Sequence, residues 1–289
     1  MEKIKKLKKI FKREKIDGYI VPKNDKFFGE YVPDYNDRLN FISNFSGSFG
    51  VALILKNMNY LFVDGRYTLQ ANEQCKKYFK IITIPNTMPY EILKGLNLKI
   101  GFDPNLFTKN KLSIFFSRTN CEFKPITINL IDEIWKRKIK KNEKKFFRLP
   151  NQSVSQNFKT KINKVVNFLK KKEADFLFIT ASENNAWLFN IRGRDTKYTP
   201  IPHSLVLVSR NKKIKFFCDL KKIPSDFKKI FNTTEFININ STDNFLSKIF
   251  KKKIIIDKNT CSYFYEDIIK KNNKILNFQD PIYFLKSIK

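Results

Sequence analysis

Histidine is almost absent from this chain, which has one, His203, among its 289 residues. A single imidazole cannot build a histidine-rich metal site or a relay of several imidazoles. The four cysteines lie far apart, without a Cys-x-x-Cys pair, which excludes a zinc ribbon and a thioredoxin-type redox site. Four cysteines in a chain of this length do not form a disulfide scaffold either, so we expect buried, reduced thiols.

Long apolar runs are missing as well. The longest clean run, 51–55, is far shorter than the roughly 18 residues that a membrane-spanning helix needs. The first sixteen residues are rich in lysine, but no apolar stretch of signal-peptide length follows them. We therefore expect a soluble, cytoplasmic protein that does not bind membranes.

Acidic residues are scarce, since 27 of them stand against 57 basic ones and give a net charge of +30. Nine of the basic residues are arginine and 48 are lysine. Lysine, asparagine, isoleucine and phenylalanine all have A/T-rich codons, so genomic codon bias explains the charge without a selected partner. Nucleic-acid binders prefer arginine, and we expect no specific nucleic-acid partner. A basic module for nucleic acid or anionic lipid is the alternative, which a clustered basic face would favour.

The hydrophobic share of 42% is enough for two buried cores. Periodicity predicts an amphipathic helix, a strand and a hairpin near the start of each half, and a strand followed by aspartate later on. The predicted elements are helices 1–15, 67–79 and 158–172, strands 17–21, 80–84, 98–101, 175–179 and 254–256, and hairpins 50–55 with 60–63 and 204–208 with 214–217. Strand order does not follow from this pattern.

Aspartates mark equivalent places in the two halves at spacings of 154 to 158 residues. The pairs are Asp17 with Asp175, Asp64 with Asp219, and Asp103 with Asp257. The chain is therefore predicted to be α/β, with two similar domains that are each a mixed β-sheet flanked by helices. The polar, helix-breaking stretch between the halves predicts domains at 1–140 and 156–289 with a linker at 141–155.

Few side chains are candidates for chemistry. Asp64, Asp103 and Asp257 each follow a strand at a turn, where aspartate caps backbone N–H groups, and capping is favoured over metal binding. His203 is interpreted as an ordinary residue at the edge of a loop. The small residues 46–50 lead into a strand, so they predict a tight turn and not a phosphate-binding loop.

Arginine is rare enough to be informative. Where codon bias favours lysine, a retained arginine hints at a need for its fixed fork of donors, and Arg38, Arg66, Arg192 and Arg194 are the candidates. A structural salt bridge remains an equally good explanation for each. Arg192 follows an apolar run and precedes Gly193, so we expect its guanidinium to project from a packed element.

Several segments together carry a family resemblance. They are Gly18–Pro22, Glu30–Val32 with Pro33, Arg38–Leu39, Ser43–Ser48, Phe62–Ala71, Ala186–Gly193 with Asp195, and Asp280–Pro281 with Leu285–Lys289. In order and spacing, the chain resembles the N-terminal portion of the three-domain Xaa-Pro aminopeptidases (aminopeptidase P). The matching segments span nearly the whole sequence.

The resemblance implies two creatinase-type N-terminal domains that precede a pita-bread domain. That domain holds a dinuclear metal site, usually manganese, and removes an N-terminal residue when proline follows. No family metal ligand or catalytic histidine matches a position here, so no catalytic or metal residue and no cofactor are expected in this chain. Arg66, Trp187 and Arg192 are the candidates for facing the other domain or its substrate.

The leading hypothesis is thus a noncatalytic portion of an Xaa-Pro aminopeptidase, inactive alone. Domains of this type are expected to narrow access to the metal site and to contribute to oligomer contacts, and a homodimer is one such assembly. The catalytic pita-bread domain would be encoded separately or lost. A natural truncation, a split-gene subunit and the product of an interrupted gene are all open, and an unrelated peptidase site in this chain is the least favoured hypothesis.

Overall fold

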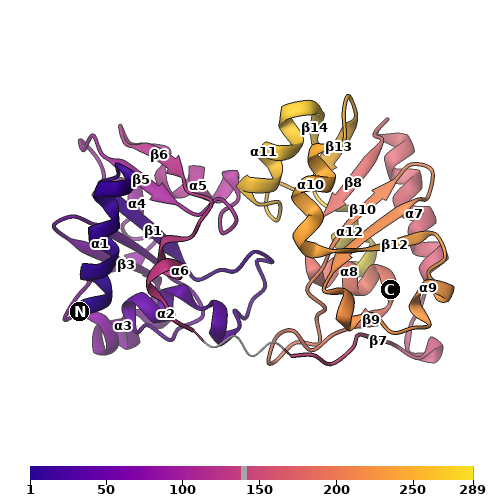
Figure 1. Ribbon diagram of the computed structural model, residues 1–289, viewed down its shortest axis with the longest axis horizontal. Helices are drawn as coiled ribbons and strands as arrows, with labels where there is room; N and C mark the ends of the chain where they lie inside the picture. The colour runs from indigo at the N-terminus through magenta and orange to yellow at the C-terminus, as the bar shows by residue number, and fades with distance from the viewer. Residues whose placement is uncertain (138–141, 289) are drawn as a thin grey trace. The chain divides into compact units, whose positions relative to one another are not determined.

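Each half of the chain opens with an amphipathic helix and a buried central strand. Helix α1 (Glu2–Glu14) buries Ile4, Leu7 and Phe11, which share one face because residues three and four apart are neighbours on a helix. The computed structural model describes residues 1–137 and 142–288 (Figure 1). These fall into two units, residues 1–26 with 32–137 and residues 27–31 with 142–288.

The first unit is a six-stranded mixed sheet in the order β4-β3-β2-β1-β5-β6. The central strand β1 pairs antiparallel with β2 and parallel with β5. The elements after α1 are β1 (Gly18–Pro22), α2 (Arg38–Ser43), β2 (Val51–Leu55), β3 (Asn59–Asp64), α3 (Thr68–Cys75), β4 (Lys80–Ile84), α4 (Pro89–Ile92), β5 (Lys99–Phe102), α5 (Lys109–Phe116), β6 (Glu122–Pro125) and α6 (Leu130–Ile134), with 3-10 turns at Asp34–Asn36 and Gly65–Tyr67.

The second unit repeats this arrangement with its own six-stranded sheet, β12-β11-β10-β8-β13-β14, and a small added pair, β7-β9. Its elements are β7 (Phe147–Arg148), α7 (Phe158–Lys171), β8 (Phe176–Ile179), α8 (Ser182–Phe189), β9 (Ile191–Arg192), β10 (Leu205–Ser209), β11 (Ile214–Cys218), α9 (Phe227–Ile230), β12 (Thr234–Asn238), α10 (Thr242–Ser247), β13 (Lys253–Ile256), α11 (Tyr263–Asn272), β14 (Lys274–Asn277) and α12 (Pro281–Ser287), with 3-10 turns at Asn151–Ser153, Leu220–Lys222 and Ile239–Ser241.

The two sheets agree strand for strand, which confirms the predicted duplication and the α/β class. The central strand β8 pairs antiparallel with β10 and parallel with β13, as β1 does with β2 and β5. Both predicted hairpins are present as β2–β3 and β10–β11. The helix expected at 67–79 is shorter, since α3 ends at Cys75 and the chain turns there to bury Phe79 before β4.

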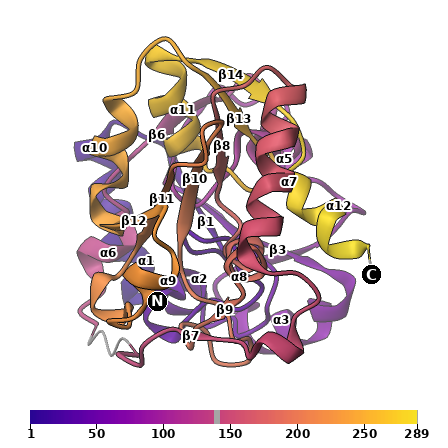
Figure 2. The same ribbon diagram turned by 90° about the vertical axis from the view of Figure 1, so that its right-hand side faces the viewer.

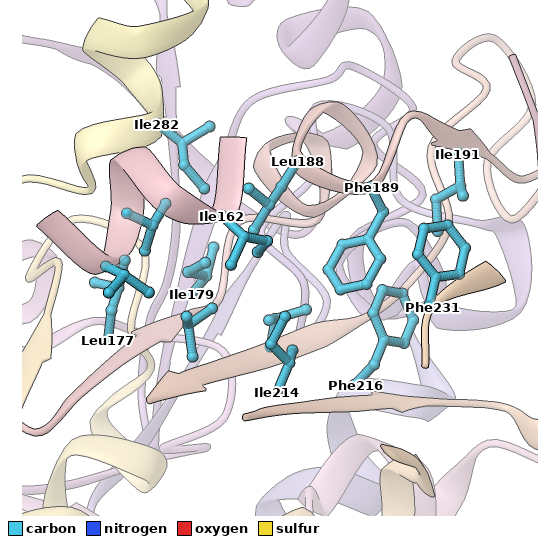
Figure 3. Packing of buried hydrophobic residues seen from close by; sticks show 14 of the residues in the cluster. Ile162, Leu177, Ile179, Leu188, Phe189, Ile191, Ile214, Phe216, Phe231 and Ile282 are labelled. Carbon is cyan, nitrogen blue, oxygen red and sulfur yellow. The ribbon is translucent and has the colours of Figure 1, made fainter. Parts of the chain in front are cut away.

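The core of the second unit lies on both faces of its sheet. Figure 2 shows the strands between α10 and α11 on one side and α7 and α12 on the other. Beneath α7 and α8, Phe189 packs edge-on against Phe216 with ring centroids 4.8 Å apart, and Phe231 contacts Phe189 at 5.2 Å (Figure 3). Such offset aromatic contacts fix the helices against the sheet.

The structure differs from the linker expected at 141–155. Phe146 is buried in the core of the second unit, and β7 pairs with β9 through Phe147 and Arg192. A polar, proline-containing stretch predicts a linker because its local pattern lacks periodicity, but three residues of this one contribute core and strand contacts. Of the expected linker, residue 141 lies outside the described residues.

Phe216 tests how far the second core depends on its aromatic contacts. Its side chain is fully buried, so we expect Phe216→Ala to lower the free energy of unfolding by about 3–5 kcal/mol. Urea unfolding followed by Trp187 fluorescence, in a Trp135→Phe background, isolates the second unit. The control Phe250→Ala removes an exposed ring and should change stability by less than about 0.5 kcal/mol. Equal losses in both variants would contradict this view of the core.

Candidate functional site

A buried carboxylate follows the parallel strand next to the centre of each sheet. In the first unit, Asp103 Oδ1 accepts the N–H of Asn105 at 2.8 Å, and its Oδ2 accepts a hydrogen bond from Asn129 Nδ2 at 2.8 Å. Asn129 in turn caps α6, since its Oδ1 accepts the N–H of Ile131. Asp103 therefore ties the turn after β5 to the start of α6.

The second unit has the same arrangement of hydrogen bonds around a buried aspartate, but the donors differ. Asp257 Oδ1 accepts the N–H of Asn259, and Asp257 Oδ2 accepts the backbone N–H of Asp280 at 2.9 Å. Asp280 caps α12 through the N–H of Ile282 and accepts a further bond from Asn184 Nδ2 at 2.7 Å. The second unit thus places two buried carboxyl groups where the first has one carboxyl and one amide.

Burial dominates the electrostatics of these groups. It raises the pKa of Asp103, although Asn129 and Asn105 partly offset the effect by hydrogen bonding. It raises the pKa of Asp280 to about 6, and the neighbouring Asp257 and Glu183 contribute in the same direction. A proton is therefore held at the start of α12 at mildly acidic pH.

Asp64 differs from these two because it lies at the surface. Its Oδ1 accepts the N–H of Arg66, and the Arg66 guanidinium closes back on the same carboxylate at 2.7 Å. This hydrogen bond lowers the pKa of Asp64. Each predicted turn aspartate accordingly accepts a backbone N–H two residues ahead. Arg66 is exposed, and its fork is engaged within its own turn.

Two cations gather at the C-terminal end of α8, and we call Lys161, Trp187, Asn190 and Arg192 the α8-end cluster. The buried Lys161 ammonium donates to the carbonyl oxygen of Trp187 at 2.7 Å and to Asn190 Oδ1, and it lies 3.9 Å from the Trp187 ring centroid. Cations are favoured there because the last carbonyls of a helix carry partial negative charge. Burial first, and then the charge of Arg192, lower the pKa of Lys161 to about 8.

Arg192 does not project from its turn as we expected. Its Nη1 donates to the carbonyl oxygens of Ile191 at 2.9 Å and Ala186 at 3.4 Å, so the guanidinium lies back against α8. Gly193 permits this because its backbone passes close to Pro202, where an added Cβ would be 2.7 Å from the proline Cα. Within 1–137 and 142–288, no carboxylate forms an ion pair with Arg192, and burial lowers its pKa.

The structure brings Trp187 and Arg192 together in the second unit, whereas Arg66 belongs to the first. His203 stacks on Phe27 with ring centroids 4.1 Å apart, as a residue of a loop edge can. The sequence did not single out the buried ion pair of Lys222 with Asp195, although Asp195 lies in a resemblance segment. Asp195 also accepts the N–H of His203 at 2.7 Å and so orders this loop.

A manganese site was expected only outside this chain. Among the described residues, no group of three or more histidine, cysteine, aspartate or glutamate side chains could hold a metal ion. Asp257 and Asp280 are two carboxyl groups already engaged with backbone and amide donors. These residues do not fit a dinuclear metal centre.

Every helix in the described part of the chain is too short or too polar to span a membrane.

Comparison with known proteins fits the duplicated fold. Two family models of the creatinase/prolidase N-terminal domain match the chain, one over residues 3–134 and the other over residues 136–289. The chain belongs to the creatinase/prolidase N-terminal domain family. The resemblance found in the sequence is therefore confirmed at the level of both domains.

Two relatives and a solved structure agree with this family assignment. The Xaa-Pro aminopeptidase ApepP of Drosophila melanogaster is 30% identical over 95% of this chain and 47% of its own. The probable Xaa-Pro aminopeptidase P of Coprinopsis cinerea is 31% identical over 73% of this chain and 35% of its own. The crystal structure of X-prolyl aminopeptidase from Caenorhabditis elegans, a cytosolic enzyme with a di-nuclear active site, gives a TM-score of 0.90 at 25% identity. This chain spans 51% of the Caenorhabditis elegans protein and less than half of each of the other two relatives.

The buried Asp280 carboxyl predicts a pH dependence of stability. Its pKa is about 6 in the folded chain against a model-peptide value of 3.8, so its stabilising contribution is complete below pH 3.8 and is lost as pH rises through 6. The difference corresponds to about 3 kcal/mol. Asp280→Asn keeps the cap but cannot ionise, so the wild type should lose about this much relative to the variant between about pH 4 and pH 7.

Urea unfolding at several pH values, followed by Trp187 fluorescence in the Trp135→Phe background, measures this difference. The reciprocal variant Asn129→Asp puts a second carboxyl beside Asp103 in the first unit. It should introduce a loss of stability with rising pH, which Trp135 next to α6 reports. Parallel pH profiles for wild type and Asp280→Asn would contradict the assignment.

Proposed function

We propose that this chain is the noncatalytic part of an Xaa-Pro aminopeptidase. The observation that carries the proposal is the pair of creatinase/prolidase N-terminal domains, which together match about half of the Caenorhabditis elegans enzyme at a TM-score of 0.90. In this role the two domains narrow access to the active site of a pita-bread domain and contribute to contacts in a homodimer. By analogy with that cytosolic enzyme, the protein works in the cytoplasm.

Catalysis belongs to the pita-bread domain in this proposal, and manganese is bound there. The described residues contribute structure to the site's surroundings and no metal ligand. Arg192 is the best supported of the residues proposed to face that domain. Only its Nη1 donates to described acceptors, so the Nε and Nη2 edge is available for a bidentate carboxylate. Trp187 holds the same cluster in place, and Arg66 is retained as a weaker candidate.

The purified chain should not release the N-terminal residue of Xaa-Pro peptides when Mn²⁺ is added. Hydrolysis needs a water activated by metal, and a stable site needs several converging ligands. The measurement is peptide cleavage by mass spectrometry over a range of manganese concentrations. A chimera joining this chain to the part of the Drosophila melanogaster enzyme that it does not match should gain the activity. Manganese-dependent cleavage by the pure chain, abolished by a point substitution in it, would contradict the proposal.

Arg192→Ala separates an internal role from a role toward the catalytic domain. Loss of its two carbonyl contacts should lower the stability of the chain by no more than about 1.5 kcal/mol. Loss of a buried carboxylate partner should weaken activity of the chimera by about 2–5 kcal/mol in transition-state free energy.

The matched control is Arg194→Ala, which removes an exposed arginine two residues away and should leave both quantities unchanged. Arg192→Lys keeps the charge without the fork and should recover only part of the activity. A large drop in unfolding free energy for Arg192→Ala, with the activity of the folded chimera intact, would show that Arg192 acts only within its own unit.

A further inference from the structure

The second unit contains a cavity of about 570 Å³ at the end of its sheet where β10 turns into β11. It is unrelated to the α8-end cluster and to the strand-end aspartates, because it lies on the α10 side of the sheet. Phe176 and Leu207 of the sheet form its floor, and Phe245 and Ile249 of the α10 segment form a wall. Cavities of roughly 300–1,000 Å³ with apolar walls and a few polar groups are the usual sites for small ligands.

Strand register shows how this end of the sheet differs between the two units. Phe176 faces Ser209 across the β8–β10 ladder, so a small side chain stands beside a large one. In the first unit the equivalent pair is Gly18 with Leu55, and the Leu55 side chain covers Gly18, lying 2.6 Å from where a Cβ would be. In the second unit, Ser209 stands at the position of Leu55, and its short side chain lines the cavity next to Phe176.

The rim of the cavity is basic, with five of its twelve lining residues lysine or arginine. A fifth of the whole chain is basic, so codon bias alone would supply about half as many. Lys215 illustrates the difference between the units, because the equivalent position in the first unit is Tyr60. Both residues face a leucine of the neighbouring strand, but this position carries a positive charge only in the second unit.

Few carboxylates balance this charge. Arg210 lies 3.6 Å from Asp175, the only acidic residue of the lining, and Lys215 pairs with Glu235. Among described residues, no ion pair involves Lys213 or Lys252, which are both exposed at the rim. A cavity with low-dielectric walls and unbalanced positive charge at its mouth attracts anions.

We propose that this cavity binds a small amphiphilic anion, with its carboxylate, sulfonate or phosphate at the lysine rim and an aromatic or short aliphatic body on the floor. The apolar floor favours such a ligand over inorganic phosphate, which would leave Phe176 and Leu207 without a partner. A concave site of this volume favours a small molecule over a nucleic-acid strand, which needs an extended basic groove. This proposal is independent of the aminopeptidase assignment.

The test uses 8-anilinonaphthalene-1-sulfonate as the probe and follows its fluorescence with the purified chain at low and at about physiological salt. We expect saturable binding at one site that octanoate displaces. The double variant Lys213→Glu with Lys252→Glu should weaken probe affinity by about tenfold or more, because it reverses the charge of the rim. Ser209→Leu copies the filled position of the first unit and should weaken binding to a similar extent without changing the net charge.

The control is Lys221→Glu with Lys228→Glu, which changes the net charge equally at exposed positions outside the cavity. The affinity of this control variant for the probe should stay within about twofold of the wild-type affinity. Equal weakening in this control, unchanged affinity in both cavity variants, or displacement of the probe by inorganic phosphate as effective as by octanoate would each overturn the proposal. Circular dichroism checks folding, and Ser209→Val replaces Ser209→Leu if the larger side chain prevents it.

Discussion

A buried carboxylate at the end of a parallel strand must find hydrogen-bond donors inside the protein, since burying it unpaired costs several kcal/mol. Asp103 and Asp257 are in this position, and each recruits a donor from a residue 26 or 23 positions further along the chain. That donor begins the last helix of its unit, α6 or α12. The closing helix is thereby placed against the sheet in both halves.

The two halves meet this constraint differently. Asn129 gives a side-chain amide in the first unit, whereas Asp280 gives its backbone N–H in the second and keeps a carboxyl of its own. The second unit therefore carries a buried proton-binding group at the start of α12 that the first unit lacks. The ladder pairs have also diverged, since Gly18 faces Leu55 in the first unit and Phe176 faces Ser209 in the second.

Hydrogen bonds to the carbonyl groups of Ala186 and Ile191 also restrict the orientation of the Arg192 guanidinium. Lys161 and Arg192 both satisfy carbonyl groups at the end of α8, where no carboxylate of the described residues neutralises them. A buried and a half-buried cation without a counter-ion are costly. The proposed contact of Arg192 with a carboxylate of a catalytic domain would relieve that cost. This chain spans about half of the Caenorhabditis elegans and Drosophila melanogaster proteins that it matches.

The sequence by itself determined the α/β class, the duplication and the turn-capping of Asp103 and Asp257, because periodicity and capping depend on residues close together in the chain. The family resemblance added the domain type. Only the tertiary structure decided the strand order, the partners of Asp280 and the core role of Phe146 in the expected linker. Lys161 could not be distinguished from the other lysines of a chain with 48 of them. Its role arises from contacts with α8, 26 residues away, and such contacts depend on how helices and strands pack.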